Sequence, residues 1–130
     1  MEACESLKHF LEEEGIEYDE KDNLIFFTYD GDSFFAQEDC GFLRIHLMCC
    51  PLDKLDNPAL DLLKICNLLN ILYPLKYYVN TEIGYIMCCI EKEEIDMQEL
   101  GKMEVDLATF RLRDGCINLL NCIKSILENS

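Results

Sequence analysis

Cysteine and histidine are the residue types in this sequence that could do chemistry, and there are nine cysteines and two histidines among 130 residues. The cysteines are Cys4, Cys40, Cys49, Cys50, Cys66, Cys88, Cys89, Cys116 and Cys122. None forms a Cys-x-x-Cys pair, and adjacent cysteines in a strand point to opposite faces of a sheet. Most are surrounded by Leu, Ile and Met, where cysteine behaves as a small buried hydrophobic residue. The sequence therefore predicts no zinc site and no disulfides, and it indicates a reducing compartment.

The two histidines, His9 and His46, lie outside any known catalytic motif. A base at His46 with Cys40 or Cys49 as nucleophile is the enzyme hypothesis that the residue types allow, and nothing in their spacing supports it. The run Asp30-Gly31-Asp32 resembles part of a calcium loop, but the rest of the twelve-residue pattern is missing, so it predicts a hairpin turn. We expect a protein that is not an enzyme and that needs no cofactor.

Composition and charge limit the possible partners. Half of the residues are hydrophobic, which favours one globular domain over residues 1–130. With 26 acidic and 11 basic residues the net charge is −15, which would repel nucleic acids and anionic lipid surfaces. The charge favours solubility alone, or else a basic partner. The sequence shows no leader peptide and no run of about 20 apolar residues, so we expect a cytoplasmic protein that does not enter a membrane.

Hydrophobic periodicity and turn residues predict an α+β domain in which helices pack on an antiparallel five-stranded sheet. The expected order is a helix, a three-stranded meander, a helix, two strands and a final helix. The predicted elements are a helix at 2–14, strands at 24–29, 33–37 and 42–50, a helix at 57–73, strands at 75–80 and 85–90, a short helical segment at 97–103 and a helix at 105–128.

The helix predicted at 57–73 is the most unusual element. Asn57 suits the N-cap and Pro58 the first helical position. Polar residues recur at every third position, so they wind around the helix and leave it apolar on nearly all sides. It is either a central core helix of the monomer or a helix covered by a second copy of the chain. For the second case the predicted dimer interface consists of Leu62, Leu63, Cys66, Leu69 and Tyr73.

The strands predicted at 24–29 and 33–37 are apolar on both faces. One face must meet the helices, and the other would expose an aromatic patch, which usually marks an interaction surface. The alternative is that the first or the last helix covers this patch. The predicted partner-binding residues are Ile25, Phe27, Tyr29 and Phe35.

The element order, together with the segments Leu7–Ile16, Phe26–Ala36 and Phe42–Ile45, resembles the type III secretion chaperone fold of bacteria, and more closely its YbjN-like relatives. The resemblance implies a homodimer with the second helix at the interface, and a non-enzymatic protein-binding module of chaperone type that captures an extended segment of a partner protein. The YbjN-like branch implies no particular biochemical activity. The nine cysteines and the segment 91–105 depart from the pattern of the family. The alternative function is a small regulatory or structural homodimer without an extended client.

Overall fold

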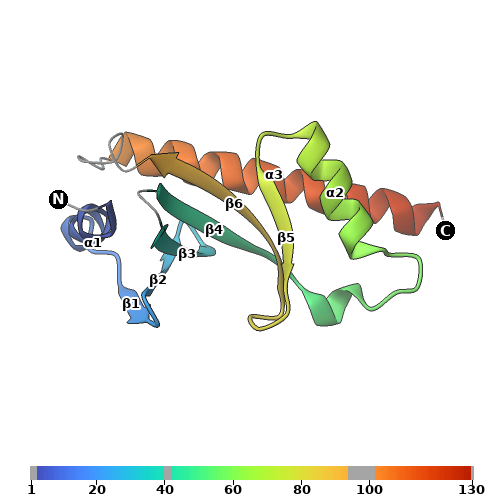
Figure 1. Cartoon of the computed structure of the whole chain (residues 1–130), viewed down its shortest axis with the longest axis horizontal. Helices are drawn as coiled ribbons and strands as arrows, with labels where there is room; N and C mark the ends of the chain where they lie inside the picture. Colours follow the sequence, from blue (N-terminus) through green and yellow to red (C-terminus); the bar gives the residue numbers. More distant parts are fainter. Residues whose placement is uncertain (1–2, 40–41, 94–101, 130) are drawn as a thin grey trace.

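The computed structural model describes residues 3–39, 42–93 and 102–129. In chain order its elements are α1 (Ala3–Glu13), β1 (Tyr18–Lys21), β2 (Leu24–Tyr29), β3 (Asp32–Asp39), β4 (Phe42–Pro51), the 3₁₀ turn η1 (Leu52–Leu55), α2 (Leu62–Leu72), β5 (Lys76–Asn80), β6 (Tyr85–Glu93) and α3 (Lys102–Glu128). The strands form an antiparallel six-stranded sheet in the order β1-β2-β3-β4-β6-β5, and α3 runs along it (Figure 1). The α+β class is confirmed.

The prediction of five strands is wrong, because residues 18–21, which form β1, were assigned to no predicted element. Its four residues pair with β2 in antiparallel register, from Tyr18 opposite Phe27 to Lys21 opposite Leu24. The connection is a two-residue turn at 22–23 in which both residues have positive φ, at 53° and 65°. The strand has one apolar residue and three charged ones, so it shows no alternation that sequence analysis could detect.

The predicted hairpin at residues 30–32 is confirmed. Asp30 and Gly31 have φ values of 49° and 88°, as a tight two-residue hairpin turn requires, and Tyr29 pairs with Asp32 across it. Arg113 of α3 holds this turn: its Nε donates to Asp32 Oδ2 at 2.5 Å and its Nη2 donates to the Asp30 carbonyl at 2.8 Å. The long helix is thereby joined to the hairpin by charge-assisted hydrogen bonds.

Helix α2 begins four residues later than the sequence indicated. Asp61 is its N-cap, and its Oδ1 accepts a hydrogen bond from the backbone N–H of Lys64 at 3.2 Å. The predicted cap, Asn57, instead accepts from Ala59 N at 2.8 Å in a local turn. Both asparagine and aspartate favour such positions, so composition alone did not distinguish the turn from the cap. The helix ends before Pro74, as predicted.

Helix α3 is continuous through Gly115, which lies within the helix predicted at 105–128. The Gly115 carbonyl accepts a hydrogen bond from the Tyr77 hydroxyl at 2.9 Å, so β5 lies directly against the helix at this point. A Cβ at Gly115 would lie 2.3 Å from Leu75 Cδ1. The glycine therefore permits a close approach of helix and sheet. The short helical segment predicted at 97–103 lies mostly outside the described residues.

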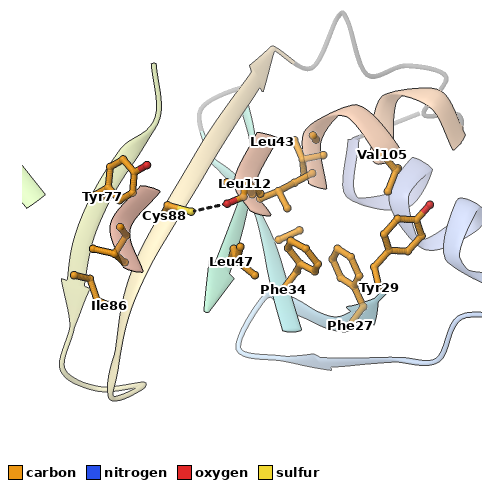
Figure 2. Packing of buried hydrophobic residues seen from close by; sticks show 14 of the residues in the cluster. Phe27, Tyr29, Phe34, Leu43, Leu47, Tyr77, Ile86, Cys88, Val105 and Leu112 are labelled. Atoms are coloured by element: carbon orange, nitrogen blue, oxygen red, sulfur yellow. Dashed lines mark hydrogen bonds between the residues drawn. The ribbon is translucent and has the colours of Figure 1, made fainter. Parts of the chain in front are cut away.

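The two faces of the sheet differ in what covers them. Leu43, Ile45 and Leu47 of β4 face the helices and belong to the hydrophobic core, whereas Arg44 and His46 lie on the opposite face, because successive side chains of a strand alternate between the two faces. Core side chains from the strands, such as Phe34 and Leu43, meet Val105 and Leu112 of α3 in Figure 2, and α1 adds Leu7, Phe10 and Leu11. We call the face of Arg44 and His46 the open face. No helix in the described ranges is both long and apolar enough to cross a membrane.

Candidate functional site

A row of cross-strand neighbours crosses the open face. Phe26 pairs with Phe35, Phe35 with His46, His46 with Cys89, and Cys89 with Lys76, so β2, β3, β4, β6 and β5 each contribute one side chain. These five residues line a hollow of about 650 Å³. Its volume is within the usual range for ligand sites, and an apolar floor with a few polar groups is their usual composition. We call it the open-face hollow.

His46 is the most constrained side chain of the hollow. It is only 6% exposed, it stacks on the Phe35 ring at a centroid distance of 4.3 Å, and its Nδ1 lies 2.6 Å from the Tyr78 hydroxyl. Burial, reinforced by the charges of Arg44 and Lys76, lowers the pKa of His46 from 6.5 to about 4. The imidazole is therefore neutral at pH 7.

The other ring nitrogen of His46, Nε2, is buried and has no hydrogen-bond partner within the described part of the chain. Buried polar groups are nearly always hydrogen-bonded, and one without a partner costs about 1–3 kcal/mol. Such a group at the wall of a hollow marks a position where a bound molecule could supply the missing partner.

Charged side chains of both signs surround the hollow. The basic ones are Lys21, Arg44 and Lys76, and the acidic ones are Asp22, Glu82 and Glu91. Arg44 and Glu91 form an ion pair, with Nε to Oε1 at 2.8 Å. Three of only eleven basic residues thus lie here, so the hollow is locally balanced in a chain whose net charge is −15.

The arrangement does not provide an activated nucleophile. The cysteine beside His46 is Cys89, and burial raises the pKa of its thiol, which keeps it protonated and unreactive. His46 Nδ1 is occupied by the Tyr78 hydroxyl. Of the two nucleophiles considered from sequence, Cys49 packs against the core on the helix side and Cys40 lies outside the described residues.

The prediction that Ile25, Phe27 and Tyr29 form an exposed patch is wrong. All three are buried on the helix side of β2, where Phe27 stacks on Phe34 at 5.6 Å and the Tyr29 hydroxyl donates to Asp106 of α3. Phe35 does lie on the open face, although its ring is only 2% exposed between neighbouring side chains.

Sequence reasoning recognised that β2 has two apolar faces but assigned the helices to the wrong one. The residues of β2 that line the open-face hollow are Leu24 and Phe26. The contribution of Tyr78 was missed because the strand predicted at 75–80 was interpreted only as a part of the sheet. One pattern in the sequence identifies the open face. Along β4, Arg44 and His46 alternate with apolar residues, so they lie on the side of the sheet away from the core.

The predicted dimer residues divide between the two sides of α2. Cys66 and Leu69 are buried against the core of the same chain, so placing them between two copies is wrong. Leu62 and Tyr73 are half-buried against that core, and Leu63 is 69% exposed. The outward side of α2 instead exposes Leu63, Leu68, Ile71 and Leu72. The helix is apolar all round, as predicted, and its own domain covers one half of it.

The described residues contain no group of three or more His, Cys, Asp or Glu side chains that could hold a metal ion. The doublet Cys88-Cys89 points to opposite faces, as expected of a strand: Cys88 is in the core and Cys89 lines the open-face hollow. Comparison of the chain with protein-family models, with curated proteins and with solved structures finds no match. The resemblance to secretion chaperones and YbjN-like proteins therefore stays a prediction.

Proposed function

We propose that this chain is a non-enzymatic protein-binding module of chaperone type, which captures an extended segment of a partner protein on the open face of its sheet. The observation that supports this most directly is the open-face hollow itself. Its floor contains Phe26, Phe35 and Tyr78, and the described helices pack on the other side of the sheet. Aromatic residues in a concave, partly polar surface are the usual anchors of protein recognition.

The shape and charge of this face suit an extended chain better than a folded domain. A segment lying across the hollow would direct every second side chain towards its floor, where Phe26 is the more exposed of the two phenylalanines, because side chains of an extended chain alternate in direction. Basic side chains of the segment would be attracted by the net charge of −15 outside the hollow. Apolar contact then provides most of the affinity, and charge increases the association rate.

The experiment is a selection from a phage-displayed library of unstructured dodecapeptides, followed by mapping of the selected peptides on the protein by NMR. We expect backbone shifts to concentrate at open-face residues of β2, β3, β4 and β6. The variant Phe26→Ser should abolish binding. The matched control is Phe110→Ser, since Phe110 is 66% exposed on α3 and outside the hollow, and this variant should bind normally.

If the selected peptides instead change the NMR shifts of α2 and α3, and bind the Phe26→Ser variant as well as the wild type, the open face is not the binding surface. That outcome would assign partner binding to the helical side of the molecule.

A second candidate function, the regulatory or structural homodimer, is favoured by the outward side of α2. Four large apolar residues there are exposed, with Ile71 at 81% and Leu63 at 69%. Burying four such side chains yields roughly 1.5–3 kcal/mol each. Association costs about 4–15 kcal/mol, so this face alone would give a marginal dimer.

Light scattering at micromolar concentration tests the dimer, which should have twice the monomer mass of 15.1 kDa. Ile71→Asp should then yield monomers. Ile117→Asp is the matched control, because Ile117 is an exposed isoleucine on α3. A chain that remains monomeric at high concentration would contradict the dimer without affecting segment capture.

A further inference from the structure

The unpartnered nitrogen of His46 indicates what the open-face hollow binds. The imidazole is held on two sides, by the Phe35 ring at 4.3 Å and by the Tyr78 hydroxyl at Nδ1. Its Nε2 has no partner in the described ranges, although the residue is 94% buried. The rigid setting and the missing partner together define one position, beneath the lining of the hollow, where a hydrogen bond remains to be made.

The hydrogen-bond chemistry of Tyr78 determines whether Nε2 donates or accepts. Burial raises the pKa of Tyr78 to about 12, so its phenol keeps its proton at neutral pH. A phenolic O–H is a good donor and a neutral imidazole nitrogen a good acceptor, so we assign the 2.6 Å contact as a hydrogen bond from the Tyr78 O–H to Nδ1. The ring proton of the neutral imidazole is then on Nε2, which requires an acceptor.

The surrounding charges favour an anionic acceptor. The two charged side chains whose fields act on the imidazole are Arg44 and Lys76, and both are cationic. Arg44 is already paired with Glu91. Lys76 is exposed and makes no ion pair with any described residue. A carboxylate at Nε2 would therefore accept a charge-assisted hydrogen bond from the imidazole. It would also be attracted by Lys76, whose charge no ion pair with a described residue compensates.

We propose that the segment captured in the open-face hollow presents an acidic side chain there, whose carboxylate accepts the hydrogen bond of His46 Nε2 next to Arg44 and Lys76. An apolar residue two positions from that acid points to the same side of the extended segment and packs towards Phe26. This inference rests on the proposed function and names the residue type that the partner segment must contribute. An acidic residue between apolar ones, with basic residues further out, is the pattern that both the hollow and its acidic surroundings select.

Access to Nε2 requires a local rearrangement, because this atom exposes less than 1 Å². The lining of the hollow includes the long side chains of Arg44, Lys76 and Lys21, which change rotamer without moving the sheet. Under the proposal, such a rotamer change admits the ligand carboxylate to the ring edge of His46 while the backbone of β4 stays in place.

The test compares three peptides that differ only in the central residue: Ac-Lys-Leu-Phe-X-Phe-Leu-Lys-amide, with X as Glu, Gln or Lys. Dissociation constants come from NMR titration, and the His46 side-chain nitrogens are observed in the same samples. We expect the Glu peptide to bind about tenfold more tightly than the Gln peptide, which is the usual contribution of a hydrogen bond to a charged group. The resonance of protonated Nε2 should shift with the Glu peptide alone.

Two variants test the roles of His46 and Lys76. His46→Phe retains the stacking on Phe35 and removes the donor, so the preference for Glu over Gln should fall severalfold, to the part that Lys76 supplies. Lys76→Met removes an exposed charge without burying anything, so it should reduce that preference severalfold even if His46→Phe fails to fold. Lys64→Met is the control for Lys76→Met, because Lys64 is an exposed lysine on α2.

The possible results of the peptide titrations separate the acidic side chain from segment capture as such. Equal affinities for the Glu and Gln peptides would overturn this inference and leave segment capture standing. Tighter binding of the Lys peptide would also overturn it, because the acidic surroundings would then dominate. If no peptide of the set binds, while 3-phenylpropionate shifts His46 Nε2, the occupant is a small aromatic acid and the segment is the wrong ligand. If nothing binds, neither the inference nor capture on this face survives.

Discussion

The side chain of Asn70 in α2 closes the free edge of the sheet by pairing with the backbone of Tyr77 in β5. Asn70 Oδ1 accepts from Tyr77 N at 2.6 Å, and Asn70 Nδ2 donates to Tyr77 O at 3.1 Å. The amide thus imitates one residue of a neighbouring strand. An uncovered edge strand would present unpaired N–H and C=O groups and invite pairing with another chain.

We predict that Asn70→Ala lowers the free energy of unfolding by about 1–2 kcal/mol, because two hydrogen bonds to a buried residue are lost. Urea denaturation measures this change. Asn67→Ala is the control, since Asn67 is an exposed asparagine on the same helix and should change stability by less than about 0.5 kcal/mol. Equal effects of the two substitutions would show that Asn70 does not stabilise the edge.

The contact between α3 and β5 at Gly115 gives a second prediction. Gly115→Val should destabilise the fold by about 1–3 kcal/mol, because the new side chain overlaps Leu75 and displaces the Tyr77 hydroxyl from its acceptor. Asp114→Val places the same side chain on the exposed neighbouring position and should be nearly neutral. Thermal unfolding of both variants compares them, and a stable Gly115→Val protein would mean that helix and sheet separate readily at this point.

Phe27 tests the assignment of the two sheet faces. Because Phe27 is buried under the helices, Phe27→Ser should lower the free energy of unfolding by at least about 3–5 kcal/mol, the usual cost of deleting a buried aromatic ring. That loss is comparable with the whole stability of a small domain, so we expect largely unfolded protein by circular dichroism. Phe110→Ser should remain folded. A folded Phe27→Ser protein would indicate that this face of β2 is not the covered one.

His46 predicts a specific dependence of stability on pH. Its pKa is about 4 in the folded protein and 6.5 ordinarily, so as the pH falls the unfolded chain takes up the proton first. The stability associated with a neutral His46 is therefore present above pH 6.5 and is lost as the pH falls towards 4. Between pH 7 and pH 5 the loss should be about 2 kcal/mol.

The measurement is urea denaturation at both pH values for the wild type and for His46→Phe. The carboxylates titrate in both proteins, so the difference between the two pH dependences isolates the histidine. Parallel curves would contradict the low pKa of His46 in the folded state.

The thiols should be slow to react in the native protein. Cys66, Cys88 and Cys89 are buried, and the pKa of Cys116 is raised by its hydrogen bond with Cys49 and by burial. A titration with an aromatic disulfide reagent should therefore modify few thiols before denaturation and nine afterwards. Fewer than nine thiols after denaturation, or one tightly bound metal ion per chain in elemental analysis, would overturn the interpretation of these cysteines as core residues.

Local patterns in the sequence determined most of the elements. The stripe of Leu7, Phe10 and Leu11 and the stop at Gly15 defined α1: Gly15 has a φ of 69°, and Ile16 N donates to Leu11 O across it. Alternation along β4 placed Leu43 and His46 on opposite faces, and the Asp30-Gly31 turn defined a hairpin. These features depend on neighbours within a few residues, so a single sequence is sufficient to predict them.

Tertiary structure alone decided which face of each element is covered. Both faces of β2 are apolar and α2 is apolar all round, so neither pattern states where the helices pack, and the predicted sites at Phe27 and Leu69 fell on buried sides. The strand β1 exists because its backbone pairs with β2, which needs no apolar side chain. The open-face hollow unites residues from five strands, and cross-strand register depends on long-range pairing that no local pattern encodes.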